Sequence, residues 1–467
     1  MAQSGVELAV ARAAEEETMQ DPRLKIRPVT ELELHDKTVI FRPDINSPID
    51  PATKRIVNTN RIEKTVPTLN LMLERGAKVA LIAHQGDTLD YQNLIPLAEH
   101  AEILSRLSGH RMSYIDDVCG PAAQAAVKAL SPGEAIILGN LRYLAEEIST
   151  FETVVKLTAQ EMTHTWLVRS LAPLADYYVN DAFAAAHRNA PSMVAFQEVL
   201  PTAGGIQLME EYTALKSVME NPRRPCVYIL GGAKISDAFD MMRKVLTDGS
   251  ADYILTAGVT GIVMHIARGV DFGPIITKFL SDRALDTFIP EAKSLLKEFG
   301  SHYVLPVDFA YDANVGQGAP SSAQTGTKLG QSTPPDSKAV RAEAPVGSLP
   351  KDRLLPDVGH QTIELFKEYI GKAGSIFVNG PAGMYEHEPW SDGTREIWQA
   401  IADAPGYTVI GGGDSITAAT RFTDLSKYAY VCTGGGAMVR FLAGKRLPLI
   451  EAMERAFERN LQAPLRR

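Results

Sequence analysis

Short apolar runs recur along the chain, and most are apolar at consecutive positions rather than at alternate ones. In the first 185 residues they are VIFRPDI (39–45), AKVALIAH (77–84), EAIILGNL (134–141) and ADYYVNDAF (175–183). Strands that are apolar on both sides are typical of parallel sheets covered by helices on both faces. The pattern therefore predicts a parallel α/β sheet in this part of the chain.

The second half of the chain shows the same pattern of consecutive apolar runs. Its runs are RPCVYILGG (224–232), ADYILTAG (251–258), HYVLPVDFA (302–310), SIFVNGP (375–381), GYTVIGGG (406–413) and YAYVCTGGG (428–436). Intervening segments such as 61–76 and 362–374 have the composition of helices. We therefore expect an α/β protein of two doubly wound parallel-sheet lobes, each Rossmann-like with three layers.

Two breaks in the pattern suggest how the chain is organised. LPTAGG (200–205) interrupts the strand–helix alternation before the helical segment 206–220, so we expect a hinge there. Residues 312–350 hold five Gly, five Pro, five Ser and no aromatic residue, which predicts a mobile surface insertion. The expected parts are an N-terminal extension at 1–36, a first lobe at 37–202, a hinge helix at 203–220, a second lobe at 221–447 that contains the insertion 312–350, and a C-terminal segment at 448–467.

Composition narrows the functional classes. With 47 Lys and Arg against 56 Asp and Glu, the net charge of −9 argues against generic binding of nucleic acid. Cys119, Cys226 and Cys432 are too few and too scattered for a disulfide framework. The acidic N-terminus does not read as a secretory signal, and the apolar run 253–264 is too short to span a membrane. We expect a cytoplasmic protein that binds neither membranes nor nucleic acid.

Basic and polar residues gather where the first-lobe strands end. Ligands of open parallel sheets bind beyond the carboxyl ends of the strands, so these residues are expected to converge. They are Arg42, Asp44, Asn46, Arg61, His84, Asn140, Arg142, Asn180, Asp181, His187 and Arg188. The planar fork of arginine suits carboxylates and phosphates, so the set predicts a site for a small polyanion. The aspartates could orient the arginines or hold a substrate hydroxyl.

The second-lobe strands end in glycine-rich segments: LGGAK (230–234), NGPAG (379–383), GGGDS (411–415) and TGGGA (433–437). Glycines let backbone N–H groups approach a phosphate, and a helix that starts just afterwards adds its positive end. Tight turns would also select glycine, but several such loops on one sheet indicate a nucleotide site. P-loop, Rossmann GxGxxG and protein-kinase motifs do not occur.

The two halves together suggest phosphoryl transfer from a nucleotide to a second substrate. Such transfer depends on positioning and charge stabilisation, and closure around a hinge would exclude water. The basic set offers no clear general base, which fits a carboxylate acceptor that is already ionised. Asp414 could contact a metal ion that arrives with the nucleotide, or it could cap a helix.

Nine ordered motifs resemble phosphoglycerate kinases, over about residues 37–448, and look most like archaeal-type members. They are FRPDINSP (41–48), NTNR (58–61), AHQG (83–86), GNLRY (139–143), NDAFAAAHRNAPS (180–192), LGGAKISD (230–237), NGPAGMYE (379–386), GGGDS (411–415) and CTGGGA (432–437). The resemblance implies a two-lobed, hinge-bending and monomeric enzyme that converts ATP and 3-phosphoglycerate to ADP and 1,3-bisphosphoglycerate with Mg²⁺. The segment after Pro448 would return to the first lobe.

The resemblance also implies roles for individual residues. The phosphoglycerate would be held by Arg42, Asp44, Asn46, Arg61, His84, Arg142 and Arg188. The catalytic group would be Lys234 on the transferred phosphoryl group, Arg61, and the amides of Gly413 and Gly435. The nucleotide would be bound by Gly232, Lys234, Gly258, Asn379, Pro381, Gly383, Glu386, Gly412, Gly413, Asp414 and Ser415, with Glu386 on the ribose and Asp414 near the metal.

Three departures from the family pattern stand out. The family reads close to SHxGRP at the second strand, whereas this chain reads AHQGDTL, so Asp87 replaces a substrate-binding arginine. Ala238 stands where many members have a second lysine, and Gly139 replaces the glutamate of LENxRF. Asp87 motivates one alternative, a kinase of the same fold that acts on a different carboxylate. A second alternative is a non-catalytic, nucleotide-binding descendant.

Overall fold

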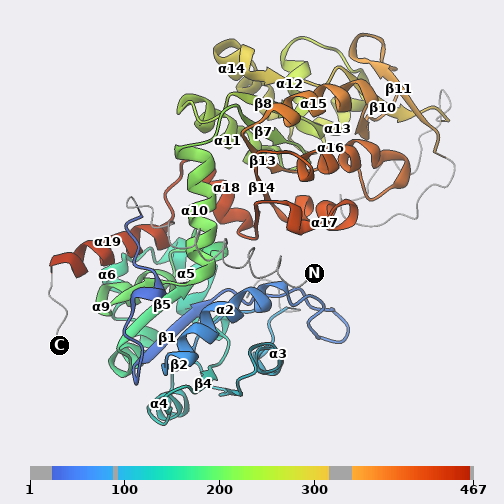
Figure 1. The fold of residues 1–467 in the computed structure, drawn as a ribbon. Helices are drawn as coiled ribbons and strands as arrows, with labels where there is room; N and C mark the ends of the chain where they lie inside the picture. The colour runs from blue at the N-terminus through green and yellow to red at the C-terminus, as the bar shows by residue number, and fades with distance from the viewer. Residues whose placement is uncertain (1–23, 88–92, 315–338, 463–467) are drawn as a thin grey trace, which may run out of the picture. The chain divides into compact units, whose positions relative to one another are not determined.

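The computed structural model describes residues 24–87, 93–314 and 339–462. The chain forms two compact units, Met1–Met209 with Leu447–Arg467 and Glu210–Arg446 (Figure 1). The division falls inside helix α10 (Ile206–Glu220), which has the same bounds as the helical segment predicted at 206–220. Each unit is built on its own six-stranded parallel sheet, which confirms the predicted α/β fold with two parallel-sheet lobes.

The sheet of the first unit has the order β3-β4-β2-β1-β5-β6, with every neighbouring pair parallel. Its strands are β1 (Thr38–Pro43), β2 (Lys78–Leu81), β3 (Met112–Tyr114), β4 (Ala135–Ile137), β5 (Tyr177–Asp181) and β6 (Thr202–Gly204). Consecutive residues such as Val39, Ile40 and Phe41 are all buried, as expected of strands covered on both faces. The edge strands β3 and β6 were not expected from the sequence.

Helices complete the first unit. They are α2 (Asn60–Glu74), α3 (Ala98–Ser108), α4 (Pro121–Lys128), α5 (Ser149–Val154), α6 (Ala159–Met162), α7 (Trp166–Leu171), α8 (Pro191–Val194), α9 (Phe196–Val199) and α19 (Pro448–Gln462), with short 3-10 turns η1 (Val29–Glu31), η2 (Leu141–Tyr143), η3 (Ala145–Glu147), η4 (Ala172–Leu174) and η5 (Phe183–Ala185). Helix α19, dark red in Figure 1, packs on α8, α9 and β6. A hydrogen bond from Leu449 N to the Ala186 carbonyl, at 3.2 Å, fixes its start.

The sheet of the second unit has the order β15-β14-β13-β7-β8-β9 and is also parallel throughout. Its strands are β7 (Cys226–Leu230), β8 (Tyr253–Thr256), β9 (Tyr303–Val304), β13 (Ser375–Asn379), β14 (Tyr407–Gly411) and β15 (Tyr430–Cys432). The helices of this unit are α11 (Ile235–Thr247), α12 (Gly258–Ala267), α13 (Pro274–Ser281), α14 (Ile289–Phe299), α15 (His360–Lys372), α16 (Asp392–Ala402), α17 (Gly413–Phe422) and α18 (Gly435–Leu442), with 3-10 turns η6 (Asp286–Phe288), η7 (Gly300–His302), η8 (Val346–Ser348), η9 (Glu388–Trp390) and η10 (Leu425–Lys427).

A small antiparallel sheet in the second unit corrects two expectations. Its order is β11-β10-β12, from β10 (Asp308–Asp312), β11 (Arg341–Pro345) and β12 (Asp357–Val358). The run 302–310 is therefore not one strand, because β9 joins the parallel sheet and β10 joins this second sheet. The expected insertion 312–350 is also not a loop throughout, since its residues 341–345 form β11; residues 315–338 lie outside the described part of the chain.

Candidate active site

A cavity of about 590 Å³ opens in the first unit where the strands end. Six of the seven residues predicted to hold the acceptor line it. These are Asp44, Asn46, Arg61, His84, Arg142 and Arg188. The departure residue Asp87 lines it as well, together with His187. The carboxyl ends of β1, β2, β4 and β5 thus bring together residues that are up to 144 positions apart in sequence.

Arg42, the seventh predicted residue, does not line the cavity. The residue is only 2% exposed, and its Nη2 donates to His84 Nδ1 at 2.9 Å. Arginine can only donate, so His84 accepts at Nδ1 and carries its proton on Nε2. Burial, with Arg42 beside the ring, holds the pKa of His84 well below its usual value. Arg42 therefore positions a neutral histidine and does not itself contact the cavity.

A buried carboxylate, Glu147, supports this arrangement and was missed by the sequence reasoning. Its side chain accepts hydrogen bonds from Ser192 N and Ser192 Oγ, both at 2.6 Å. Ser192 Oγ in turn accepts from Arg42 Nε at 3.4 Å, and Arg142 Nη1 donates to the Glu147 carbonyl. Burial raises the pKa of Glu147, while Ser192, Arg42 and Arg142 act in the opposite direction. The result is a fixed acidic support beneath the arginines.

The arginines that reach the cavity are each held by a neighbour. Arg61, in the first turn of α2, donates from Nη1 to Asp44 Oδ2 at 2.8 Å, so Asp44 orients its fork. Arg142 is 6% exposed. Its burial, and to a smaller extent the repulsion from Arg188, lower the pKa of Arg142 to about 10. Asn46 Oδ1 accepts from Gly86 N at 3.0 Å and thereby ties the β1 loop to the β2 loop. Such anchoring pre-organises the cavity for an anion.

Asp87 points a carboxylate into this basic environment. Its Oδ2 accepts from Ser149 Oγ at 3.3 Å, and it lies close enough to Arg142 to favour the charged guanidinium. Ser149 Oγ also accepts from Arg188 Nη2 at 3.3 Å. The predicted departure is thus part of the cavity wall.

Glycines with left-handed backbone mark the strand ends of the second unit. Gly232, Gly258 and Gly412 have φ of +74°, +54° and +88° and follow β7, β8 and β14. A Cβ atom would have open space at Gly413 and Gly435, the first residues of α17 and α18. Two helix N-termini with open space beside their first residue therefore lie at the end of one sheet, an arrangement that suits phosphates.

The loops after β7 and β13 approach each other closely. Gly232 N donates to the Pro381 carbonyl at 2.8 Å, and a Cβ atom on Gly380 would lie 2.2 Å from the Gly231 carbonyl oxygen. Lys234 directly precedes α11 and is exposed. Ala238, four residues on, faces the core at 4% exposure. The sequence placed these loops correctly at the strand ends, and the structure adds the close backbone approach.

Ser415 and Asn379 have structural contacts in this unit. Ser415 is 1% exposed, and its Oγ accepts from Gly380 N at 2.7 Å, which ties the β14 loop to the β13 loop. Asn379 is half-buried, and a Cβ atom on Gly412 would lie 2.4 Å from its Oδ1. Asp414 and Glu386 are both exposed. Of these four residues predicted to bind the nucleotide, Asp414 and Glu386 are the two whose side chains are exposed.

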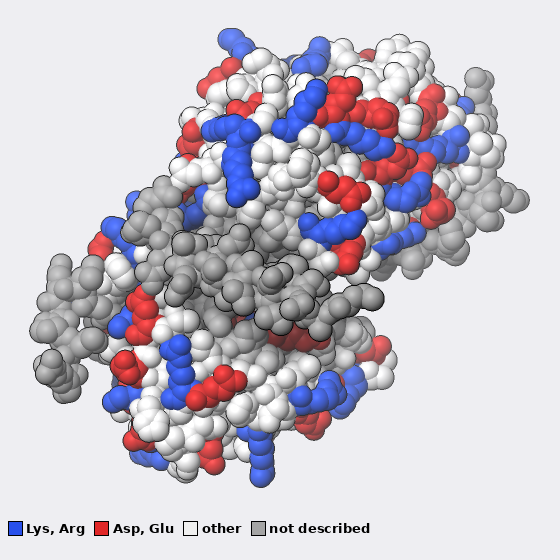
Figure 2. All heavy atoms as spheres, viewed as in Figure 1, with Lys and Arg blue, Asp and Glu red and all other residues white. Residues whose placement is uncertain are grey.

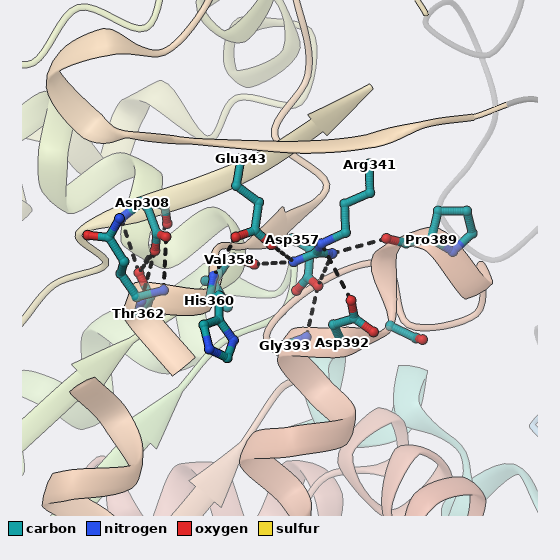
Figure 3. Close-up of polar contacts among 12 residues, drawn as sticks. Asp308, Arg341, Glu343, Asp357, Val358, His360, Thr362, Pro389, Asp392 and Gly393 are labelled. Carbon is teal, nitrogen blue, oxygen red and sulfur yellow. Dashed lines mark hydrogen bonds and ion pairs between the residues drawn. The ribbon is translucent and has the colours of Figure 1, made fainter. Parts of the chain in front are cut away.

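Gly383 rests on a charged network that sequence reasoning missed. A Cβ atom on Gly383 would lie 2.3 Å from Asp357 Oδ1. Asp357 Oδ2 accepts from Arg341 Nη1 and from Gly393 N, both at 2.9 Å, and Arg341 also binds Glu343 Oε1 at 2.8 Å (Figure 3). Arg341 comes from β11, so the strand within the expected insertion supports the loop after β13.

Glu211 links α10 to the TGGGA loop. It is 1% exposed and accepts from Thr433 N at 2.7 Å, from Thr433 Oγ1 at 3.1 Å and from Cys432 Sγ at 3.3 Å. The segment that leads to Gly435 is therefore anchored by a buried carboxylate. A lone glutamate within α10 carries no sequence signal for this role.

One group of metal-ligand side chains occurs among the described residues, and it is already satisfied. His360, Glu364 and Glu396 place ligand atoms within 4.8 Å of one another. Lys367 Nζ lies between the two glutamates, at 2.8 Å from Glu364 and 2.6 Å from Glu396. The lysine supplies the positive charge, so this cluster is an ion-pair network. Asp414, the predicted metal contact, is not part of it.

The surface carries both signs of charge. On the face drawn in Figure 2, Lys and Arg side chains are interspersed with Asp and Glu. Within the described part of the chain, no helix is both long enough and apolar enough to pass through a bilayer.

Comparison with known proteins identifies the family. The phosphoglycerate kinase family model matches residues 29–445. The phosphoglycerate kinase of Methanothermobacter thermautotrophicus is 36% identical over 92% of this chain and 97% of its own length, and that of Thermococcus kodakarensis is 37% identical over 92% and 98%. The crystal structure of phosphoglycerate kinase from Pyrococcus horikoshii matches with a TM-score of 0.79 and 33% sequence identity, and the match covers 93% of this chain and 100% of that one. The structure of phosphoglycerate kinase from Coxiella burnetii matches with a TM-score of 0.74 and 26% identity, over 92% of this chain and 99% of that one. The resemblance expected from the motifs is confirmed, and the chain belongs to the phosphoglycerate kinase family.

Proposed function

We propose that the protein is a phosphoglycerate kinase, which transfers the γ-phosphoryl group of Mg-ATP to the carboxylate of 3-phosphoglycerate and releases ADP and 1,3-bisphosphoglycerate. The observation that carries this proposal is the cavity of the first unit in a chain of this family. Arg61, Arg142 and Arg188 reach the cavity from α2, η2 and the segment after η5, and His84 adds an N–H donor. A ligand with a carboxylate and a phosphate matches such donors.

The chemistry asks little of a general base. A carboxylate acceptor is ionised at neutral pH, so it can attack the γ-phosphorus directly. The new bond joins the carboxylate oxygen to phosphorus, and the bond from phosphorus to the β,γ-bridging oxygen breaks with its electron pair leaving on ADP. Rate enhancement then depends on holding the groups in line and on balancing charge. Among the cavity residues, we assign to Arg61 the role of balancing the negative charge of the acceptor carboxylate during transfer.

The second unit would bind the nucleotide. The glycines after its strands and the N-termini of α17 and α18 supply backbone amides for phosphate oxygens, with Gly413 and Gly435 the open positions. Lys234, exposed at the start of α11, would sit on the transferred group, and Glu386 would reach the ribose. Mg²⁺ prefers carboxylate and phosphate oxygens, so the exposed Asp414 fits as a contact for the nucleotide-bound ion. When bound, the ion neutralises phosphate charge.

Two alternatives were left open by the sequence, a kinase for a different carboxylate and a non-catalytic nucleotide-binding protein. The relatives favour neither, because they are named phosphoglycerate kinases. Retention of Lys234 and of the open glycine loops also agrees with catalysis. The expectations of a cytoplasmic monomer that binds no nucleic acid stay predictions.

A coupled assay tests the proposal. Purified protein is mixed with 3-phosphoglycerate, Mg-ATP, glyceraldehyde-phosphate dehydrogenase and NADH, and NADH oxidation is followed. We expect a rate at least about 100-fold above that of Lys234→Ala, since loss of one charge-stabilising group typically costs that much. Lys278→Ala, which removes an exposed lysine on α13, is the matched control and should keep the wild-type rate. Wild-type oxidation no faster than that of Lys234→Ala would refute the function.

A further inference from the structure

Arg188 is covered by a carboxylate from its own chain. Its Nε donates to Glu152 Oε1 at 2.6 Å, and its Nη2 contacts the same oxygen. The other oxygen of Glu152 accepts from Asn189 N at 3.2 Å. Both side chains of the ion pair are only 14% exposed. Glu152 therefore occupies the donors of a cavity arginine in the way that an anionic group of a ligand would.

Glu152 is carried by a weakly anchored segment. Helix α5 has no buried residue, and its last residue Val154 is 72% exposed, with Val155 next to it at 48%. The polar contacts of Ser149 and Glu152 with Asp87, Arg188 and Asn189 link it to the cavity. A segment with few buried apolar contacts can move at small cost. Glu152 can thus leave Arg188 without disturbing the core.

The other carboxylates of the cavity region differ from Glu152 in this respect. Glu147 is 1% exposed and accepts two hydrogen bonds from Ser192 at 2.6 Å. Asp44 directly follows the buried strand β1 and is tied to Arg61. Glu152 combines a direct pair to a cavity arginine with a supporting helix that has no buried residue, which is the combination that an exchangeable counter-ion requires.

We propose that Glu152 competes with the acceptor for Arg188, so that binding of the acceptor displaces Glu152 and loosens α5. This inference rests on the proposed function, because it assigns the competed group to the anionic acceptor of that site. It makes Glu152 a determinant of acceptor affinity. Asp87, which shares Ser149 with Arg188, adds a second negative charge beside the same donors. The affinity for the acceptor is then set by how readily Glu152 yields, as well as by the arginines.

The central test is Glu152→Gln, which keeps the shape of the side chain and removes its charge. Calorimetric titration without nucleotide would measure binding of 3-phosphoglycerate and, separately, of inorganic phosphate at low ionic strength. We expect both to bind about 3- to 10-fold more tightly to Glu152→Gln, since a competing charge-assisted pair is lost. Glu102→Gln, an exposed carboxylate on α3 outside the cavity, is the matched control and should leave both affinities unchanged.

The sign of the change separates the two possible roles of Glu152. If Glu152 served only to position Arg188, Glu152→Gln would bind the anions no better than the wild type, and this result would overturn the proposal. The gain must also disappear in an Arg188→Met background, where there is no guanidinium to compete for; a gain that persists there would refute it. Thermal melting of each variant verifies that it is folded.

Hydrogen exchange supplies an independent readout. In the wild-type protein, 3-phosphoglycerate should raise amide exchange across residues 149–155, whereas Glu152→Gln should show raised exchange before any ligand is added. Exchange in this segment that is unchanged by saturating ligand would contradict displacement. The phosphate titration keeps the inference separate from the proposed function, because absence of turnover with 3-phosphoglycerate refutes the function, whereas phosphate affinity reports on Glu152 alone.

Discussion

Asp357, the first residue of β12, is buried against the first turn of α16, and its titration should be visible in the stability of the second unit. The carboxylate is 1% exposed, with Arg341 and the Gly393 amide as donors to Oδ2. Arg341 divides its charge among Asp357, Glu343 and Asp392. Burial raises the pKa of Asp357 to about 6 from 3.8, although Arg341 acts to lower it. The folded chain therefore holds this proton more tightly than the unfolded chain does.

The direction of the pH effect follows from that difference. Below pH 3.8 the group is protonated in both states, and its stabilising contribution is fully present. As pH rises through 6 the folded state must also ionise the buried group, and the contribution is lost. A change from 3.8 to about 6 corresponds to about 3 kcal/mol, at roughly 1.4 kcal/mol for each tenfold change in proton affinity.

Asp357→Asn removes the titration and keeps the shape. The free energy of unfolding of the variant, minus that of the wild type, should therefore rise by about 2.4 kcal/mol between pH 4 and pH 7.5, because the carboxyl of the unfolded chain is already more than half ionised at pH 4. Comparing variant with wild type cancels the other carboxylates, which titrate in both. Asp282→Asn, an exposed carboxylate on the surface of the same unit, should show no such rise.

Tryptophan fluorescence during urea unfolding can follow the second unit separately. Trp390 and Trp398 belong to that unit and are both buried, while Trp166 belongs to the first unit and is half exposed. A Trp166→Phe background therefore leaves reporters in the second unit only. A difference between Asp357→Asn and its parent that stays flat from pH 4 to pH 7.5 would refute the reasoning, because it would mean that Arg341 keeps Asp357 ionised throughout.

Three further substitutions test the site. Asp87→Arg should raise kcat/KM for 3-phosphoglycerate about tenfold or more in the coupled assay, since it exchanges a repelling carboxylate for a charge-assisted donor. An unchanged or lower kcat/KM would exclude Asp87 as a determinant of specificity. Glu211→Ala should lower kcat by about tenfold or more, because the part-buried donors of Thr433 lose their acceptor. An unchanged kcat would show that the loop needs no such anchor. Gly380→Ala should raise KM for ATP and lower the melting temperature, since φ is +87° and the Gly231 carbonyl is 2.2 Å from the new Cβ; normal values of both would contradict the need for glycine there.

The parallel strands and the helix at 206–220 could be predicted because their signals are local. Buried strands of four to six residues, such as β1 and β7, leave continuous apolar runs, and α10 has the predicted bounds 206–220. Strands outside a longer apolar run leave no such signal. The strands β3, β6 and β12, of two or three residues, and β11, of five, were therefore not predicted, whereas the three-residue strands β4 and β15 lie in the runs 134–141 and 428–436. The run at 302–310 predicts one strand, although Pro306 lies between β9 and β10.

Part of the candidate site could also be predicted from local sequence signals, and part could not. Residue types and strand ends were enough to predict which arginines would converge, because topology alone brings those ends together. Roles that depend on tertiary partners were beyond the sequence. The hydrogen bond from Gly380 N to Ser415 Oγ joins two loops, and Glu147 and Glu211 accept from donors on segments far away in the chain; the role of Ser415 near the phosphates stays a prediction.

The first-unit site also shows how an acidic chain can bind a polyanion. Four guanidinium groups stand at the cavity or just behind it, on Arg42, Arg61, Arg142 and Arg188, and four carboxylates face them, on Asp44, Asp87, Glu147 and Glu152. Because the formal charges cancel, net attraction does not explain selective binding. Selectivity must come from the fixed geometry of the donors and from which carboxylate can be displaced. Burial separates the carboxylates: Glu147 is locked at 1% exposure, whereas Glu152 sits on a helix with no buried residue. An anion can therefore replace Glu152 but not Glu147, so the cavity gains its positive charge only when the ligand arrives.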